Sequence, residues 1–219
     1  MSLRVGAITQ SNNSSKKETN KIPTHVIATT VVGTLLTTGA YIYSLARNKN
    51  GKNILQKIRQ VELGIKEGIL LCTSSTVGGL IGGLLADKKE NRIPKLQESV
   101  HQVVGNGVIP FSCLAAVNLL TKGLKQSIRT VIAIGTLFAS TFLGHSVVDK
   151  IIKTPKKYEV GFIDFAPDID DWVLAASTVI KNKALYKFTA TVCPLTYAVL
   201  GIKTGLKQKE ENNMLDIKS

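Results

Sequence analysis

Long stretches without a charged residue constrain the fold of this chain more than any other feature of its sequence. They occupy residues 24–46, 69–86, 99–121, 130–148 and 188–202. A helix rises about 1.5 Å per residue, so about 20 apolar residues cross a hydrocarbon core about 30 Å thick. The first four stretches have this length, and the fifth reaches it if Lys187 extends its amine to the headgroups. The pattern predicts an all-α, polytopic transmembrane helix bundle of about five spans.

A soluble bundle of unusually buried helices is the alternative fold class. Surface helices of soluble proteins carry charged residues on their outer face, and the first four stretches carry none. These stretches are nevertheless rich in Thr, Ser and Gly, and aromatic residues make up only 5% of the chain. Membrane helices often place Trp and Tyr at the interface, where only Tyr41, Tyr43, Trp172 and Tyr186 are available. The distribution of charge favours the membrane.

The apolar stretches and the polar segments between them predict the bounds of each element. Polar tails over residues 1–22 and 204–219 flank a transmembrane helical domain over residues 23–203. Within this domain we expect spans near residues 23–46, 68–86, 100–121, 129–148 and 184–202. Residues 53–67 are expected to form a basic amphipathic helix, and residues 87–98 a charged loop. Residues 172–180 are expected to form a short re-entrant or interfacial helix, because nine residues cannot cross a bilayer.

The second span contains two overlapping pairs of glycines, Gly78 with Gly82 and Gly79 with Gly83. Lipid tails are as apolar as leucine, so helices in a bilayer associate through close packing, which glycine permits. The pairs predict tight packing against another span, a second copy of the chain or another membrane protein. The alternative is flexible glycine without a packing partner.

Two spans contain residues that typically interrupt a helix. The third span contains Gly105, Asn106, Gly107 and Pro110, and the fifth contains Pro194. A break frees backbone polar groups, which protein or water must then satisfy, and many transporters place binding sites at such breaks. We expect a helix break in both spans, and the alternative is a kink that binds nothing.

The formal net charge of +13 requires a partner of opposite sign. The basic residues lie between the apolar stretches and no zinc-ligand spacing is present, so we expect anionic lipid rather than nucleic acid. The expected headgroup contacts are those of the amphipathic helix: Lys52, Lys57, Arg59 and Lys66. A solvated helix packed on a neighbour is the alternative reading of this segment. The Lys and Arg counts of the loops favour a cytoplasmic N-terminus by a small margin.

An acidic cluster precedes the short helix: Asp164, Asp168, Asp170 and Asp171. These carboxylates can cap a helix that begins near Trp172, pair with basic loops, or bind a hard cation. The segment lacks the glycine and closing glutamate of an EF-hand. Capping is the favoured interpretation, and no metal centre or cofactor is predicted.

The three histidines, His25, His101 and His145, lie near the expected ends of spans. An ionisable group at membrane depth is a candidate for function, whereas one near the end of a span can reach headgroups and water. The short connector between the third and fourth spans predicts an antiparallel hairpin. Such a hairpin would allow His101 and His145 to approach each other.

A short internal similarity links the two halves of the chain. The sequence Ala-Asp-Lys ends the second span at residues 86–88, and Val-Asp-Lys ends the fourth at residues 148–150. A Gly-Leu-Lys sequence follows the third span at residues 123–125 and the fifth at residues 205–207. This similarity predicts a repeated hairpin, with the second and third spans matched by the fourth and fifth.

No catalytic residue is predicted, since the chain lacks a nucleophile elbow, an HExxH, a P-loop and a GxGxxG sequence. The three cysteines, Cys72, Cys113 and Cys193, lie in apolar stretches and are expected to remain free. Two classes of function remain. The glycine pairs favour a non-enzymatic membrane scaffold or interaction protein. The alternative is a small channel or carrier for ions or small solutes that uses the helix breaks.

Overall fold

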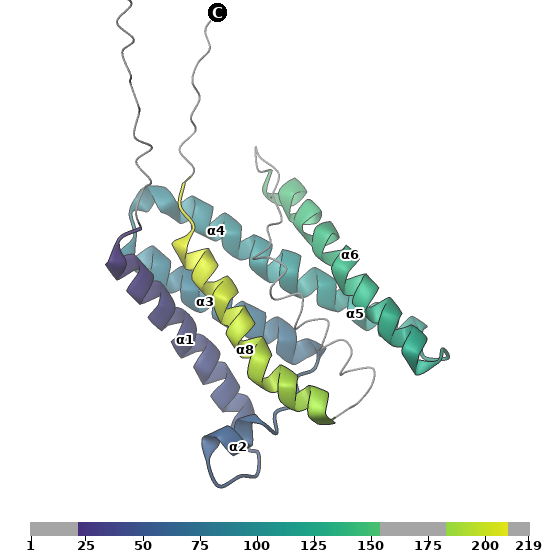
Figure 1. Cartoon of the computed structure of the whole chain (residues 1–219). Coiled ribbons are helices and arrows are strands. Elements are labelled where there is room, and N and C mark those ends of the chain that lie inside the picture. The colour runs from purple at the N-terminus through teal and green to yellow at the C-terminus, as the bar shows by residue number, and fades with distance from the viewer. Residues whose placement is uncertain (1–21, 154–182, 210–219) are drawn as a thin grey trace, which may run out of the picture.

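The computed structural model describes residues 22–153 and 183–209, and these residues form helices and no strands. The all-α class is therefore confirmed (Figure 1). The α-helices are α1 (Thr24–Ala46), α2 (Ile54–Ile58), α3 (Ile65–Ala86), α4 (Arg92–Val100), α5 (Ile109–Leu120), α6 (Gln126–Ile152) and α8 (Lys183–Leu206). A 3-10 turn, η1 (Lys89–Asn91), precedes α4, and a π-helix, η2 (His101–Val108), joins α4 to α5.

Four helical segments are long and apolar enough to cross a bilayer: α1, α3, the continuous run Lys89–Leu120, and α6. Large apolar side chains point outward from them, and Leu85 and Leu120 are 82% and 84% exposed. Such side chains suit a surface that faces acyl chains rather than water. The four helices are compatible with the multi-span membrane protein that the sequence predicts. Helix α8 is not among them, so a count of five spans stays a prediction.

The third span begins well before its expected start. Residues 92–98 belong to helix α4, although the sequence predicted a charged loop there. Pro94 caused the error, because proline ends many helices. Here Pro94 lies in the first turn of α4, where a missing N–H removes no hydrogen bond of the helix.

The predicted amphipathic helix over residues 53–67 is wrong in its extent. Within it only Ile54–Ile58, which forms α2, and the first residues of α3 from Ile65 are helical. The Asn53 side chain caps α2 by accepting a hydrogen bond from the Gln56 N–H at 2.9 Å. The following residues Val61 and Leu63 are buried. These apolar residues belong to a non-helical segment that contacts the bundle core. They do not form the apolar face of a surface helix.

Helix α1 packs tightly on one face of α3. A Cβ added at Gly78 would overlap the carbonyl oxygen of Gly33, and one added at Gly82 would overlap the backbone of α1. One turn away, the hydroxyls of Thr38 and Ser75 lie 2.7 Å apart and form a hydrogen bond between the two helices. Glycine is required along this face because the two backbones touch.

Helix α8 packs on the adjacent face of α3. A Cβ added at Gly79 would overlap the carbonyl oxygen of Gly201, and one at Gly83 would overlap that of Gly205. Residue numbers rise together along this contact, so α3 and α8 run parallel. The four glycines of the two predicted pairs in α3 are therefore all occupied by contacts within the chain.

Helices α5 and α6 form the antiparallel hairpin that their short connector predicts. Helix α6 therefore runs in the same direction as α3 and α8 (Figure 1). Helices α6 and α8 are parallel, whereas the predicted repeat requires them to form an antiparallel hairpin, so that prediction is wrong. The matched residues lie at helix ends, where Gly, Asp and Lys are common in any helix and carry no information on direction.

The beginning of α1 and the end of α8 lie at the same end of the bundle (Figure 1). There the His25 Nε2 lies 3.1 Å from the carbonyl oxygen of Ala86, at the end of α3. The N–H of Lys209 donates to Asn91 Oδ1 at 3.0 Å. Five spans that alternate in direction would instead place the beginning of α1 and the end of α8 at opposite ends of the bundle.

The tight contact between α3 and α8 predicts that Gly79→Ala lowers thermal stability. The added Cβ overlaps a backbone carbonyl, which cannot move aside as the end of a flexible side chain can. Overpacking of this kind costs about 1–3 kcal/mol. The measurement is the fraction of full-length protein that remains monodisperse in detergent after heating.

The matched control is Gly39→Ala in α1, where an added Cβ meets nothing within 4 Å. Alanine is favoured over glycine in a helix by about 0.5–1 kcal/mol, so this variant should equal or exceed the wild type. Equal behaviour of the two variants would contradict the close approach of α3 and α8.

Candidate functional site

Buried polar side chains follow one another from α4 through η2 to α6. They are Glu98, His101, Gln102, Asn106 and His145. All but the last lie within the candidate span Lys89–Leu120, and His145 lies within α6. Polar and ionisable groups are costly at membrane depth, and where they occur they mark functional sites. This set is the strongest candidate site in the described part of the chain.

The π-helix η2 carries three of these side chains. Its turns are wide, and the Ile109 N–H bonds to the carbonyl of Val104, five residues earlier. Pro110 follows directly, and in a regular α-helix its ring would clash with the carbonyl four residues earlier. We attribute the wide turns to this proline. Short π-helical segments are rare and are frequently found at functional sites.

The helix breaks expected from the sequence are not present. At Gly105, Asn106, Gly107 and Pro110 the chain widens into η2 and remains helical. Helix α8 likewise continues through Pro194. A proline within a bilayer is tolerated because neighbouring helices and local changes in helical geometry satisfy the freed groups.

Two glycines bring η2 and α6 into backbone contact. A Cβ added at Gly144 would overlap the carbonyl oxygen of Gly105, and one at Gly105 would lie 2.8 Å from His145 Nδ1. Gly105 thus acts in helix packing rather than in a helix break. The close approach allows His145 to reach across to side chains of η2.

Hydrogen bonds join the buried side chains into one continuous series. Gln102 Nε2 donates to Glu98 Oε1 at 2.7 Å, and Asn106 Nδ2 donates to Gln102 Oε1 at 2.7 Å. His145 Nε2 lies 2.9 Å from Asn106 Oδ1, and its Nδ1 lies 3.1 Å from His101 Nδ1. The hairpin thus brings together His101 and His145, an approach that the sequence allows but does not itself show.

Charged residues lie at both ends of this series. Glu98 pairs with Lys203 and Lys207 of the α8 end, at 3.3 and 3.8 Å. His101 Nε2 lies 3.4 Å from Asp149 Oδ1 of α6. We call the six residues from Glu98 to Asp149 the buried polar chain: Glu98, Gln102, Asn106, His145, His101 and Asp149. Its members lie on α4, η2 and α6, and Glu98 links the chain to two lysines at the α8 end.

Sequence reasoning missed most of the buried polar chain. Glu98 was assigned to a loop, and Lys203 to the end of a span that extends to Leu206. Gln102 carried one signal that could have revealed it, since it lies four residues after Glu98 and four before Asn106. Polar residues at this spacing line one face of a helix.

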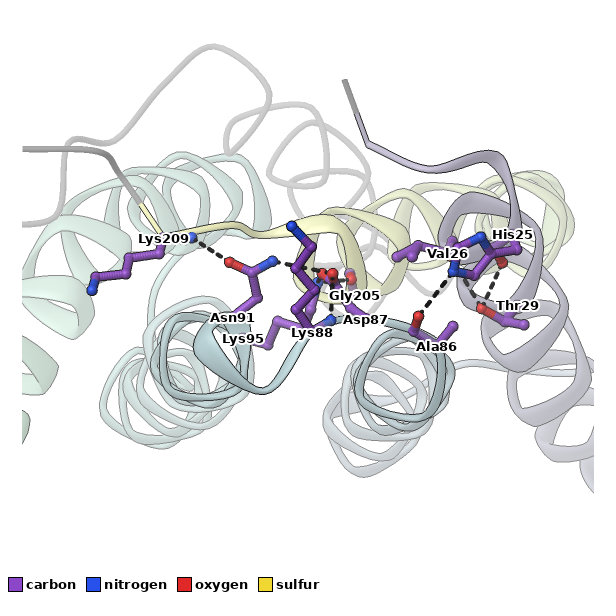
Figure 2. Close-up of polar contacts among 10 residues, drawn as sticks. All are labelled: His25, Val26, Thr29, Ala86, Asp87, Lys88, Asn91, Lys95, Gly205 and Lys209. Atoms are coloured by element: carbon purple, nitrogen blue, oxygen red, sulfur yellow. Dashed lines mark hydrogen bonds and ion pairs between the residues drawn. The ribbon is translucent and has the colours of Figure 1, made fainter. Parts of the chain in front are cut away.

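A second polar cluster joins the ends of α3, α4 and α8 (Figure 2). Lys95 Nζ lies 2.8 Å from Asp87 Oδ2, and these side chains are only 0% and 3% exposed. Lys95 also donates to the carbonyl oxygen of Gly205 in the last turn of α8. Asn91 Nδ2 donates to Asp87 Oδ1 at 3.1 Å, and Asn91 accepts from the Lys209 N–H. This cluster holds the α8 end in place.

The Asp87 carboxyl is strongly stabilised in its charged form. Burial alone would raise its pKa. Hydrogen bonds from Lys95, the Lys88 backbone and Asn91, together with the charge of Lys95, outweigh burial and hold the pKa of Asp87 below its usual value. Asp87 is therefore a carboxylate at neutral pH.

The four predicted headgroup residues lie near α2 and the start of α3. Lys52, Arg59 and Lys66 are exposed. Lys57 is half-buried, and its Nζ donates to the carbonyl oxygen of Arg47 at 3.4 Å. Contact with lipid stays a prediction for all four.

Some of the predicted residues lie outside the part of the chain that the structure describes. The acidic cluster of Asp164, Asp168, Asp170 and Asp171 and the expected short helix over residues 172–180 lie outside the described residues. Within residues 22–153 and 183–209, no group of three or more His, Cys, Asp and Glu is arranged to hold a metal ion. None of the three cysteines, Cys72, Cys113 and Cys193, forms a disulfide bond.

No model of a known protein family matches this chain, and no curated protein or solved structure matches it either.

The pKa of Asp87 predicts a specific loss of stability in acid. A group whose pKa is lowered by folding stabilises the folded state fully above its unfolded pKa, near 3.8. That stabilisation is lost as the pH falls through the folded pKa. Thermal stability of the wild type should therefore fall progressively as the pH drops below the ordinary carboxyl pKa of about 3.8, and in Asp87→Asn this component should be absent.

Two further variants separate the charge from the packing. Asp87→Asn alone leaves Lys95 buried without its counter-ion, at a cost of about 3–5 kcal/mol, whereas adding Lys95→Met should recover much of the loss. Glu90→Gln removes an exposed carboxylate of η1 and serves as the control. An acid profile of Asp87→Asn identical to the wild type would refute the assignment.

Proposed function

We propose that this protein is a small membrane carrier that couples the passage of a small solute or ion to the binding of a proton at the buried polar chain. The observation that carries the proposal is the continuous series of hydrogen bonds between ionisable groups at membrane depth. Intramembrane acids and histidines of this kind serve proton-coupled movement in pumps and transporters.

The charges at the two ends of the chain support this function. Glu98 and Asp149 supply two negative charges, and Lys203 and Lys207 supply two positive ones. With both histidines neutral, these formal charges sum to zero. One added proton therefore changes the local charge by one unit in a medium that screens it weakly.

The placement of the buried polar chain supports coupling to a conformational change. Four of its members lie on the continuous run of α4 and η2, and the other two lie on α6, which contacts that run through side chains and the glycines Gly105 and Gly144. A change in protonation at one member alters the contact between α6 and η2, or between α4 and α8. Alternating access in carriers proceeds by movement of packed helices relative to one another.

Proteoliposomes that contain the full-length chain and an internal pH indicator test the proposal. The panel of solutes comprises Na⁺, K⁺, amino acids, sugars and small carboxylic acids. We expect at least one member to cause proton movement with the wild type, and we expect His101→Gln to reduce the rate at least tenfold. Glu90→Gln should retain the rate.

The proposal fails if no solute of the panel causes proton movement in wild-type proteoliposomes, or if His101→Gln moves protons at the same rate as the wild type. The non-enzymatic character expected from the sequence is part of this proposal.

A membrane scaffold is a second candidate function, and the exposed basic side chains near α2 favour it. The glycine pairs give it less support, because contacts with α1 and α8 already occupy them. Lys52, Arg59 and Lys66 remain available to anionic headgroups.

Retention of anionic lipid tests this second candidate. Protein purified from membranes should retain less phosphatidylglycerol when Lys52, Arg59 and Lys66 are all changed to Gln, because about 1 kcal/mol of attraction is lost per charge near the surface. The control changes three other exposed basic residues, Lys88, Lys89 and Arg92, to Gln. Equal retention by the two triple variants would exclude a specific headgroup site.

A further inference from the structure

Helix α8 lies at the same depth as α3, which is long and apolar enough to cross a bilayer. Gly201 packs against the backbone of α3 between Ser75 and Gly79, and Gly205 packs against it between Gly79 and Gly83. The two helices run parallel, and the 24 residues of α8 extend over about 36 Å. A helix that packs in this way along a span passes through the same layer of the membrane.

The end of α6 lies at the same end of the bundle as the end of α8. His101 Nε2 lies 3.4 Å from Asp149 Oδ1, near the end of α6. Glu98 lies about one turn before His101 and pairs with Lys203, near the end of α8. Lys153 follows Asp149 by about one turn and ends α6. Two salt bridges therefore link the two helix ends through the same stretch of α4 and η2.

The start of α8 lies at the opposite end of the bundle. Lys187 precedes Lys203 by four to five turns, which places it about 24 Å further along the helix axis. It lies beside the start of α3, at the end where α1 finishes and α6 begins (Figure 1). In a membrane, Lys153 and Lys187 are therefore on opposite sides.

The sequence between α6 and α8 contains no apolar helix of the usual spanning length. Its longest charge-free run within residues 154–182 is Trp172–Ile180, and nine residues cannot cross a hydrocarbon core. The same segment holds five acidic residues: Glu159, Asp164, Asp168, Asp170 and Asp171. From the sequence alone, a segment of this kind reads as a loop that stays on one side.

We propose that the chain crosses the membrane six times, and that residues 154–182 make the fifth crossing. The six are the four candidate spans, this segment and α8. The directions of α6 and α8 carry the inference, because two parallel spans are joined only by a connection that crosses between them. It rests on the membrane placement in the proposed function, and it does not depend on transport.

This assignment replaces the re-entrant or interfacial helix expected near residues 172–180. Such a helix returns to the side from which it entered, so it cannot by itself connect Lys153 to Lys187. Acidic side chains and irregular backbone are tolerated at membrane depth only in contact with protein or water. The fifth crossing is therefore made against the bundle and not as a lipid-exposed helix.

Cysteine labelling of the full-length chain in sealed membrane vesicles tests the inference. Each single variant is made in a Cys113→Ala background, because the other two native cysteines are buried. A membrane-impermeant maleimide is added first outside the vesicles and then after they have been permeabilised. The variants are Lys153→Cys and Lys187→Cys, and both positions are exposed. We expect one of them to react at least tenfold faster before permeabilisation, and the other only after it.

Two reference positions assign the sides. Lys209→Cys, beyond the end of α8, should behave as Lys153→Cys does, and Lys122→Cys, in the connector between α5 and α6, should behave as Lys187→Cys does. If either principal variant fails to fold, Lys150→Cys and Lys183→Cys replace the pair, with the same expected result. Labelling of Lys153→Cys and Lys187→Cys from the same side would overturn the inference.

The pattern of all four positions separates this inference from the proposed function. Lys153 and Lys187 on one side, with Lys122 and Lys209 on opposite sides, would remove the fifth crossing and leave a membrane carrier possible. Labelling of all four positions from one side would remove both. The expected pattern without any solute-dependent proton movement would keep the six crossings and remove the carrier.

Discussion

Four helical segments are long and apolar enough to cross a bilayer, where polar groups have no water to bind, and much of the structure is compatible with this constraint. In α1 the hydroxyls of Thr34 and Thr37 donate to carbonyls one turn earlier, at 2.9 and 3.1 Å. Larger polar groups cannot be satisfied within one helix. They are joined across helices, as in the pair of Lys95 with Asp87 and in the buried polar chain.

The glycine contacts of α3 fix the position of α8, and this position makes the polar contacts between helices possible. Gly79 and Gly83 bring α8 close to α3 and set its register along the axis. In that register Lys203 reaches Glu98, and the carbonyl of Gly205 reaches Lys95. The backbone packing of α3 against α8 thus determines which charged groups of α4 and α8 meet.

The sequence predicted the parts of the fold that depend on local composition. Charge-free length predicted the apolar helices, and a short connector predicted the hairpin that joins His101 to His145. The direction in which each helix runs was not predictable, because an apolar stretch has the same composition whichever way it crosses a bilayer. Pro94 concealed the start of α4, since its effect depends on its position within the first turn. Gln102 and Asn106 form part of the site through their hydrogen bonds with each other and with His145 of α6, which lies far from them in the sequence.

The salt bridges of Glu98 have a consequence for biosynthesis. The ribosome makes α4 well before α8, so Glu98 is synthesised before Lys203 and Lys207. The nascent protein carries a carboxylate whose two lysine partners arrive with the end of α8. Docking of α8 therefore adds two salt bridges to a helical segment that was made earlier. A chain that ends before Lys203 lacks both of them.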